Sequence, residues 1–224
     1  MHTARHELIR PPAAHVDGFR RVLAEYSPSC LVVDARARDG GIGGLVPVTD
    51  THRIAGPALT VNLSIDDLVD CMPVLALAQP GDVVVLAARQ SRTTAMWGAL
   101  MSTLSQKAGV AGSIVDGAIR DVDEIRDLGF PVWYRSTVPR ASPSAVHGRT
   151  EPVQVNVPVV VGGEVIHPGD IVVADVNGVA VVPAGDAEAV LEATHAQIDK
   201  ERIVREKIAS GMSLPELLAE FGHL

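Results

Sequence analysis

Aromatic residues and cysteines are scarce in this sequence, and no long apolar run is present. Phe, Trp and Tyr make up 3% of the 224 residues, whereas hydrophobic residues make up 47%. The core must therefore be built from Val, Ile, Leu and Ala, as in the buried sheets of α/β proteins. Two cysteines are too few for a disulfide framework or a cysteine zinc site. Cys30 and Cys71 both lie in apolar stretches, which predicts that both are small core residues.

A basic charge balance is also missing, since the formal net charge is −8. This argues against nucleic acid as a partner, because phosphate binding needs a basic face. A small anionic substrate remains possible, because a local Arg and a metal can outweigh the global field. No run reaches the ~18 apolar residues that a membrane span requires, and residues 1–7 lack the apolar region of a signal peptide. We therefore expect a cytoplasmic protein that does not bind membranes.

Hydrophobic periodicity predicts strands alternating with helices up to about residue 135, then mainly strands, then helices. An N-terminal helix is expected at about residues 14–26, and C-terminal helices at about 186–221, the last opened by the capping-box pair Ser213 and Glu216. The predicted strands are 31–35, 57–62, 83–87, 113–115, 131–134, 153–157, 159–161, 164–166, 171–174 and 179–182, and the other helices are 66–78, 93–108 and 122–128. This order predicts a single compact α/β domain over residues 1–224, with a mixed sheet flanked by helices.

Two glycine-containing patterns invite a functional interpretation. Residues 39–44 are rich in glycine, but Val46 stands where the third Gly of a dinucleotide fingerprint belongs. A plain flexible loop is therefore the simpler interpretation. Pro-Gly-Asp occurs at 80–82 and again at 168–170, each time before a Val-rich strand. Two copies of a three-residue turn do not establish an internal repeat.

Charged residues concentrate at residues 116–124, where a predicted strand passes into a predicted helix. Ligands collect at the carboxyl ends of strands in α/β sheets. Asp121 is a good N-cap for a helix that starts at Val122, Glu124 sits at the capping-box position, and Arg120 can pair with a neighbouring acid. Equally, an Arg grips a carboxylate with two hydrogen bonds, and an adjacent Asp is a hard oxygen ligand for Mg²⁺. The residues alone leave the structural and the functional interpretation open.

This stretch, residues 112–127, resembles the core of the RraA-like family, which includes 4-hydroxy-4-methyl-2-oxoglutarate aldolases, oxaloacetate decarboxylases and the RraA regulator of ribonuclease E. The similarity spans roughly residues 30–220. Its motifs are Gly-Pro-Ala at 56–58, the two Pro-Gly-Asp turns, Trp-Gly at 97–98, Val-Asp-Gly-Ala-Ile-Arg-Asp at 115–121, Gly-Gly at 162–163, Ala-Asp at 174–175, Gly-Val at 178–179 and Gly-Met-Ser-Leu at 211–214. The resemblance implies an RraA-like, swivelling-domain-like α/β/α fold and a homotrimer or a hexameric dimer of trimers.

The resemblance also implies a metal-dependent lyase, an aldolase or decarboxylase, that acts on small 2-oxo acids through a pyruvate enolate. Arg120 would hold the 2-oxo acid, and Asp121 would bind Mg²⁺, Mn²⁺ or another divalent metal, directly or through water. A glutamate from a neighbouring chain could reach this metal. The substrate carboxylate would be held by the backbone amides of Gly98, Ala99, Leu100 and Met101. Unpaired amides in a first helical turn favour an anion, which requires that helix to begin near residue 97.

Ala99 departs from the family pattern, because the aldolases carry an acid there, in an Asp-x20-Arg-Asp spacing. Retro-aldol cleavage needs a base to remove the hydroxyl proton, whereas oxaloacetate decarboxylation needs only a Lewis acid. Ala99 therefore favours a decarboxylase, or a non-catalytic RraA-like binding protein of the ribonuclease E regulator type. Asp116 and Glu124 are candidates to replace the missing acid. The histidines nearest the match, at 147 and 167, have no motif partner and are expected to be exposed loop residues.

Overall fold

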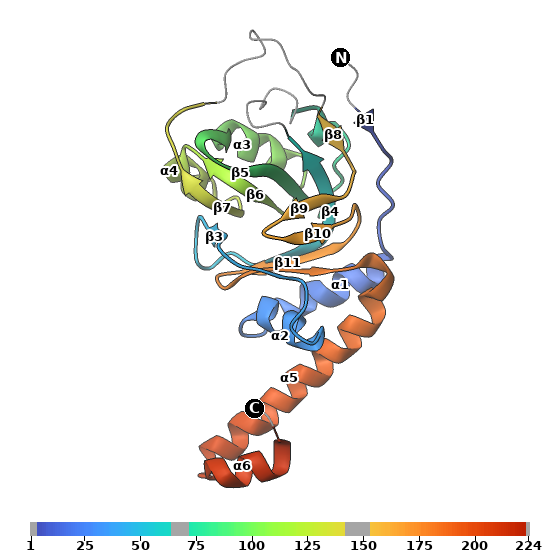
Figure 1. Ribbon diagram of the computed structural model, residues 1–224, viewed down its shortest axis with the longest axis vertical. Coiled ribbons are helices and arrows are strands. Elements are labelled where there is room, and N and C mark those ends of the chain that lie inside the picture. The colour runs from blue at the N-terminus through green and yellow to red at the C-terminus, as the bar shows by residue number, and fades with distance from the viewer. Residues whose placement is uncertain (1–3, 64–71, 142–152, 223–224) are drawn as a thin grey trace.

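A ten-stranded mixed sheet forms the body of the protein (Figure 1). The computed structural model describes residues 4–63, 72–141 and 153–222. The sheet runs in the order β2-β12-β11-β4-β5-β6-β7-β3, with β8 paired to β4 and β1 to β8, while β9 and β10 form a separate hairpin. The neighbours β4, β5, β6 and β7 are parallel, and β11, β12, β2 and β3 join antiparallel. The expected α/β domain with a mixed sheet is confirmed.

The strands are β1 (Ala4–Arg5), β2 (Gly41–Ile42), β3 (Val46–Pro47), β4 (Ile54–Asn62), β5 (Val83–Trp97), β6 (Gly112–Ile119), β7 (Val132–Thr137), β8 (Gln154–Val155), β9 (Val159–Val161), β10 (Glu164–Ile166), β11 (Ile171–Asp175) and β12 (Gly178–Val182). The helices are α1 (Ala13–Val22), α2 (Pro28–Ala35), α3 (Ala99–Lys107), α4 (Val122–Leu128), α5 (Ala187–Ala209) and α6 (Leu214–Phe221), with 3-10 helices η1 (Met72–Ala76) and η3 (Ala184–Asp186).

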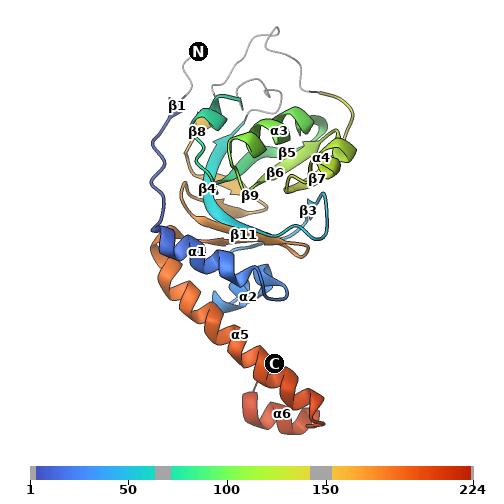
Figure 2. The ribbon, with the colours of Figure 1, turned by 180° about the vertical axis from the view of Figure 1, so that it is seen from behind.

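Three apolar layers hold these elements together, and all are dominated by aliphatic side chains, as the composition predicts. One face of β5, β6 and β7 packs under α3 and α4, and the other lies under the β9–β10 hairpin (Figures 1 and 2). Helices α1 and α2 cover β4, β11 and β12. The few aromatic residues are used at the centres of these layers, where four are almost completely buried: Trp97, Trp133, Phe19 and Phe130.

The far part of α5 and the whole of α6 extend away from the sheet as an arm (Figures 1 and 2). The buried residues of α5 lie in its first third, where the helix packs against α1 and α2. Helix α6 folds back on α5 and is held there by the Lys207–Glu220 ion pair at 2.5 Å. The predicted capping box is present, since Ser213 and Glu216 exchange both hydrogen bonds. The Ser213 hydroxyl and then the Ser213 backbone N–H donate hydrogen bonds that lower the pKa of the exposed Glu216 carboxyl.

Several predicted elements need correction. The apolar run 31–35 belongs to α2 and is not a strand, because periodicity cannot separate a short buried strand from a buried helix. Cys30 lies on the outer side of this helix and is exposed, so its assignment to the core is wrong. Cys71 and residues 66–70 of the predicted helix 66–78 lie outside the described residues, and within the described part residues 72–76 form the 3-10 helix η1 and not an α-helix. The predicted helix 93–108 begins only at α3, because β5 continues to Trp97.

The two Pro-Gly-Asp turns have the same local structure. The glycine adopts a φ of +90° in both, a conformation that side chains with a Cβ rarely adopt. In both, the Asp Oδ2 accepts a hydrogen bond from the backbone N–H three positions earlier, at 2.8 Å for Asp82 and 2.7 Å for Asp170. A strand starts directly after each turn, β5 in the first case and β11 in the second. The motif therefore marks two equivalent entries into the sheet.

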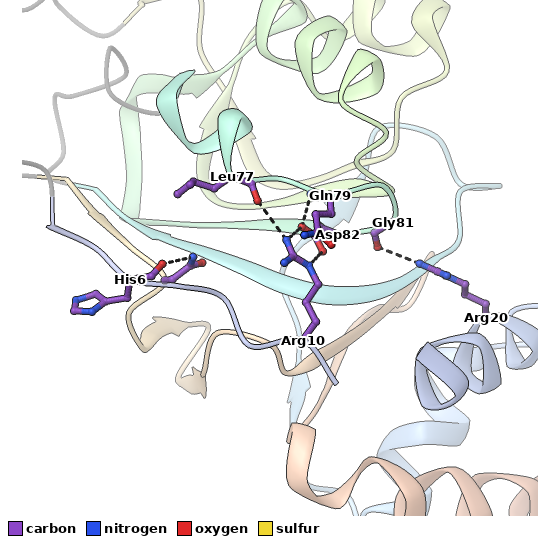
Figure 3. Close-up of polar contacts among 8 residues, drawn as sticks. His6, Arg10, Arg20, Leu77, Gln79, Gly81 and Asp82 are labelled. Atoms are coloured by element: carbon purple, nitrogen blue, oxygen red, sulfur yellow. Dashed lines mark hydrogen bonds and ion pairs between the residues drawn. The ribbon is translucent and has the colours of Figure 1, made fainter. Parts of the chain in front are cut away.

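The first of these turns also anchors the N-terminal segment (Figure 3). Arg10 Nε and Nη2 donate to the two carboxylate oxygens of Asp82, at 2.9 and 2.6 Å, and Nη2 also donates to Leu77 O at 3.3 Å. The hydrogen bonds to Asp82 raise the pKa of the Arg10 guanidinium. The N-terminal segment is held at a second point, where Asn156 Nδ2 donates to His6 O at 2.8 Å. The carboxylate of this family motif is thus used for structure, and Asp82 is only 1% exposed.

Candidate functional site

The first turn of α3 is held from behind by buried polar groups. Gly98 is the N-cap residue of this helix, and the expected helix start near residue 97 is confirmed. The indole Nε1 of Trp97 donates to Ser102 Oγ at 2.8 Å, and Ser102 Oγ donates to Gly98 O at 3.2 Å. Trp97 and Ser102 are almost fully buried, so this turn is firmly positioned. The Trp-Gly motif therefore sets where the free amides of the turn lie.

Arg120 and Asp121 come directly beside that turn, because β5 and β6 are parallel neighbours and end together. The backbone N–H of Arg120 donates to Trp97 O at 3.0 Å. Asp121 Oδ2 accepts a hydrogen bond from the Ala99 N–H at 3.2 Å and lies 3.4 Å from Arg120 Nε. The two side chains are 38% and 31% exposed, so solvent reaches both. A carboxylate and a guanidinium thus meet at a helix N-terminus that solutes can approach. We call this place, formed by Arg120, Asp121 and the first turn of α3, the corner.

Asp121 does not act as the helix cap that its position suggests. It is the N-cap residue of α4, but its side chain makes no capping hydrogen bond there. Its backbone is left-handed, with a φ of +58°, a conformation that Asp and Asn tolerate better than most residues. Non-glycine residues in this region cost free energy and cluster at functional sites. The carboxylate is therefore turned away from its own helix and towards α3.

Gly98 leaves the space that this carboxylate occupies. A Cβ on Gly98 would lie 2.7 Å from Asp121 Oδ2 and 3.3 Å from Arg120 Cγ. The φ of Gly98 is −161°, an extended conformation open to any residue, so the backbone does not require glycine. The requirement is steric and comes from the carboxylate.

A divalent metal fits this corner with one carboxylate of the chain. The described residues contain no group of three or more His, Cys, Asp or Glu side chains placed to share an ion. Mg²⁺ does not need such a cage, because it keeps several waters and takes one or two carboxylates. The absence of a Cβ at Gly98 lets the Asp121 carboxylate lie here, and this carboxylate is a hard oxygen donor of the kind that such an ion prefers.

Some of the remaining predicted site residues lie on the first turn of α3, and the others lie elsewhere. The Ala99 amide is already bound to Asp121, while the Leu100 side chain is 72% exposed on the same turn and Met101 is buried. Asp116 forms an ion pair with Arg135 on β7 and is buried, so it does not face the corner. Exposed residues elsewhere include Glu124 on α4 and the loop residue His167, whereas His147 lies outside the described residues.

Sequence reasoning missed two residues that shape the site, Ser102 and Arg135. Ser102 lies in the predicted helix 93–108 and Arg135 directly follows the predicted strand 131–134, and only the fold shows that Ser102 reaches Trp97 and that Arg135 reaches Asp116. Two cavities, of about 270 and 480 Å³, lie between α2 and β2 and between α2 and α5, and neither includes Arg120 or Asp121.

Comparison with known proteins agrees with these motifs. The family model described as RraA-like, Aldolase/RraA, matches residues 29–181. A Halalkalibacterium halodurans protein provisionally named 4-hydroxy-4-methyl-2-oxoglutarate aldolase is 37% identical over 178 residues, 79% of this chain and 82% of its own. A Methanocaldococcus jannaschii protein without an assigned function is 31% identical over 79% of this chain and 84% of its own.

Solved structures give the same result. Streptomyces coelicolor RraAS2, described as an unusual member of the RNase ES inhibitor RraA family, superposes with a TM-score of 0.75 and 29% identity, over 88% of this chain and 98% of its own. A Pseudomonas syringae protein reaches a TM-score of 0.73 at 26% identity, over 92% and 98% of the two chains. Among the described residues, no helix is long and apolar enough to cross a membrane. The matched motifs, the fold and these relatives together show that the chain belongs to the RraA-like family.

Proposed function

We propose that this protein is a divalent-metal-dependent C–C lyase that acts on small 2-oxo acids by way of a pyruvate enolate. The observation that carries the proposal is Asp121, whose carboxylate leaves its own helix uncapped and lies in solvent reach beside Arg120. The name of the Halalkalibacterium halodurans relative supports a lyase of this class. The first turn of α3, where Leu100 is 72% exposed, adds backbone donors that suit the carboxylate of such a substrate.

Each group in the corner has a separate task in this proposal. The Arg120 guanidinium offers two parallel N–H donors to the 2-oxo acid and stabilises negative charge that develops on its oxygen. The backbone amides of Gly98, Leu100 and Met101 hold the substrate carboxylate. Asp121 holds Mg²⁺ or Mn²⁺, and the Ala99 amide fixes the orientation of its carboxylate. The bound ion would supply Lewis-acid stabilisation of the enolate.

Ala99 sets which bond cleavage is favoured. Its side chain is apolar and only 8% exposed, so it cannot remove a proton from a substrate hydroxyl. Asp116 cannot take over this task, because it is buried in its ion pair with Arg135. Decarboxylation of oxaloacetate releases CO₂ and needs no such proton transfer before the bond breaks. We therefore propose oxaloacetate as a better substrate than 4-hydroxy-2-oxo acids.

The test is pyruvate release over a panel of 2-oxo and 4-hydroxy-2-oxo acids, each with Mg²⁺, with Mn²⁺ and with EDTA. We expect release from oxaloacetate above its spontaneous rate, dependent on the metal and abolished by EDTA. No release from any substrate with either metal would contradict the proposal. That result would favour a binding role of the kind described for the RNase ES inhibitor family, to which the Streptomyces coelicolor structure belongs.

The assembly belongs to the same proposal. Because the described residues contain no group of three or more His, Cys, Asp or Glu side chains that could hold an ion together, a neighbouring chain is a natural source of further ligands. We propose a homotrimer or a dimer of trimers, in which a glutamate from an adjacent copy approaches Asp121. Light scattering coupled to gel filtration measures the mass of the assembly, and a monomer at assay concentration would contradict this part.

A further inference from the structure

A β-bulge interrupts β6 shortly before the Arg120–Asp121 corner. Val115 of β6 pairs with Tyr134 of β7, and the next paired residues are Ala118 and Ser136. Two residues of β6, at 116 and 117, therefore lie opposite the single residue Arg135. Such a bulge bends the strand and redirects the side chains that follow, and bulges are frequent beside active sites. Here the residues that follow are the ones proposed to act on the substrate.

The two side chains at the bulge bind each other. Arg135 Nε donates to Asp116 Oδ1, and the two side chains are only 10% and 3% exposed. Arg135 Nη1 also donates to the carbonyl oxygens of Gly43 and Gly44, at 3.3 and 3.2 Å. The guanidinium thus ties the extra residue of β6 to β7 and to the loop between β2 and β3. A buried charge of either sign would be strongly destabilising without its partner.

The bulge connects to the corner through a short and well-bonded piece of chain. Arg120 lies four positions after Asp116, a span of about 13 Å in an extended strand. On that path Ile119 O accepts a hydrogen bond from the Val138 N–H at 3.0 Å, and the Arg120 N–H donates to Trp97 O. The segment between the ion pair and the corner is short and held by backbone hydrogen bonds. A change in the bulge should therefore shift Asp121 relative to α3.

We infer that the buried Asp116–Arg135 pair is a positioning device, which holds the β6 bulge and so places Arg120 and Asp121 against the first turn of α3. This inference rests on the proposed function for its catalytic consequence, but its geometric consequence stands alone. Its signature is the hydrogen bond from the Ala99 N–H to Asp121, which exists only if the two strand ends keep their present offset.

The test compares Arg135→Met with Arg10→Met. Arg10 is a matched control, because it forms the other buried Arg–Asp pair, with Asp82, at the opposite end of β5 (Figure 3). Both variants remove a guanidinium from a buried carboxylate and should lower stability. In protein labelled with [¹⁵N]alanine, we expect the Ala99 amide resonance to shift in Arg135→Met and to remain unchanged in Arg10→Met. We expect kcat for pyruvate release from oxaloacetate with Mg²⁺ to fall about 10²-fold in Arg135→Met alone, since small misplacements have effects of this size.

If Arg135→Met does not fold, Arg135→Lys and the neutral double variant Asp116→Asn, Arg135→Met replace it, since both avoid an unpaired buried charge. An unchanged Ala99 resonance in the folded variants would overturn the inference. So would a shift of the same size in Arg10→Met, because the pair would then act only through stability. A wild-type protein that releases no pyruvate contradicts the proposed function, while the Ala99 resonance still decides the positioning role.

Discussion

Two kinds of aspartate stand in the motifs of this protein, and they differ in what surrounds the carboxylate. Four are nearly buried and fully engaged in hydrogen bonds or ion pairs within the fold: Asp82, Asp116, Asp170 and Asp175. Asp175, for example, accepts from Ser29 N and Ser29 Oγ at 2.9 and 2.7 Å and so holds the start of α2. Asp121 is 31% exposed, and its contacts are longer, at 3.2 and 3.4 Å.

The surroundings of each carboxylate indicate which motif residues are available to bind a solute. A buried carboxylate with every lone pair satisfied stabilises the fold and cannot also bind a solute. Both contacts of Asp121 are made by Oδ2, and we propose that its other carboxylate oxygen binds the ligand; its left-handed backbone conformation costs free energy. Three substitutions test this contrast: one at Arg120, which pairs with Asp121, one at Gly98, which leaves space for its carboxylate, and one at Ala99, whose amide donates to it.

The largest effect is expected from Arg120→Lys. Lysine keeps the charge but loses the planar pair of donors, so the change is not conservative at a carboxylate site. We expect the variant to lose about 2–4 kcal/mol of transition-state stabilisation, so that kcat/KM for oxaloacetate falls roughly 30- to 1,000-fold. Arg126→Lys on the exposed side of α4 is the matched control and should leave kinetics unchanged. Equal kinetics in both variants would remove Arg120 from the mechanism.

Gly98→Ala should have the next largest effect. The added Cβ would lie 2.7 Å from Asp121 Oδ2, so the carboxylate must move, while the extended backbone accepts alanine without strain. We expect kcat to fall about 10²-fold with little change in the midpoint of thermal unfolding. Gly185→Ala, where nothing lies within 4 Å of the new Cβ, is the control. Normal turnover in Gly98→Ala would show that the position of the carboxylate is unimportant.

The smallest effect is expected from Ala99→Asp, which restores the acid found in the aldolases. A carboxylate is tolerated in the first turn of a helix. We expect the ratio of aldolase to decarboxylase activity to rise by about tenfold or more, because only the aldolase reaction uses a base on the substrate hydroxyl. Ala99→Asn has the same shape without the charge and should leave the ratio unchanged. A ratio that does not move in Ala99→Asp would mean that another residue is the base.

Sequence patterns predicted the parts of this architecture that depend on local chemistry. Helix α4 has the predicted bounds 122–128, the capping box of α6 follows from Ser213 and Glu216, and the late hairpins follow from their glycine turns. The run 31–35 was beyond prediction, because its burial comes from β11, β12 and α5, all more than 130 residues away in the sequence. The same holds for the Asp116–Arg135 pair, which exists only once β6 and β7 are neighbours.

For the site, the pattern placed Arg120 and Asp121 at a strand end but left capping and catalysis open. Whether the Asp121 side chain caps α4 depends on its left-handed backbone and on its hydrogen bond from the Ala99 N–H. Neither feature can be predicted from the spacing of residues 116–124. Likewise, the sequence shows a glycine at position 98 but not the carboxylate that requires it.

The central claim is that Asp121 serves a ligand and the buried aspartates serve the fold, and one paired measurement tests it directly. Asp121→Asn and Asp175→Asn are compared by urea unfolding and by Mg²⁺-dependent pyruvate release from oxaloacetate. Asparagine tolerates the left-handed backbone, so we expect Asp121→Asn to keep its unfolding free energy within about 0.5 kcal/mol and to lose metal-dependent turnover. Asp175→Asn should lose about 2 kcal/mol of stability and remain active while folded. An Asp121→Asn variant that is destabilised as much as Asp175→Asn and still turns over would contradict the account.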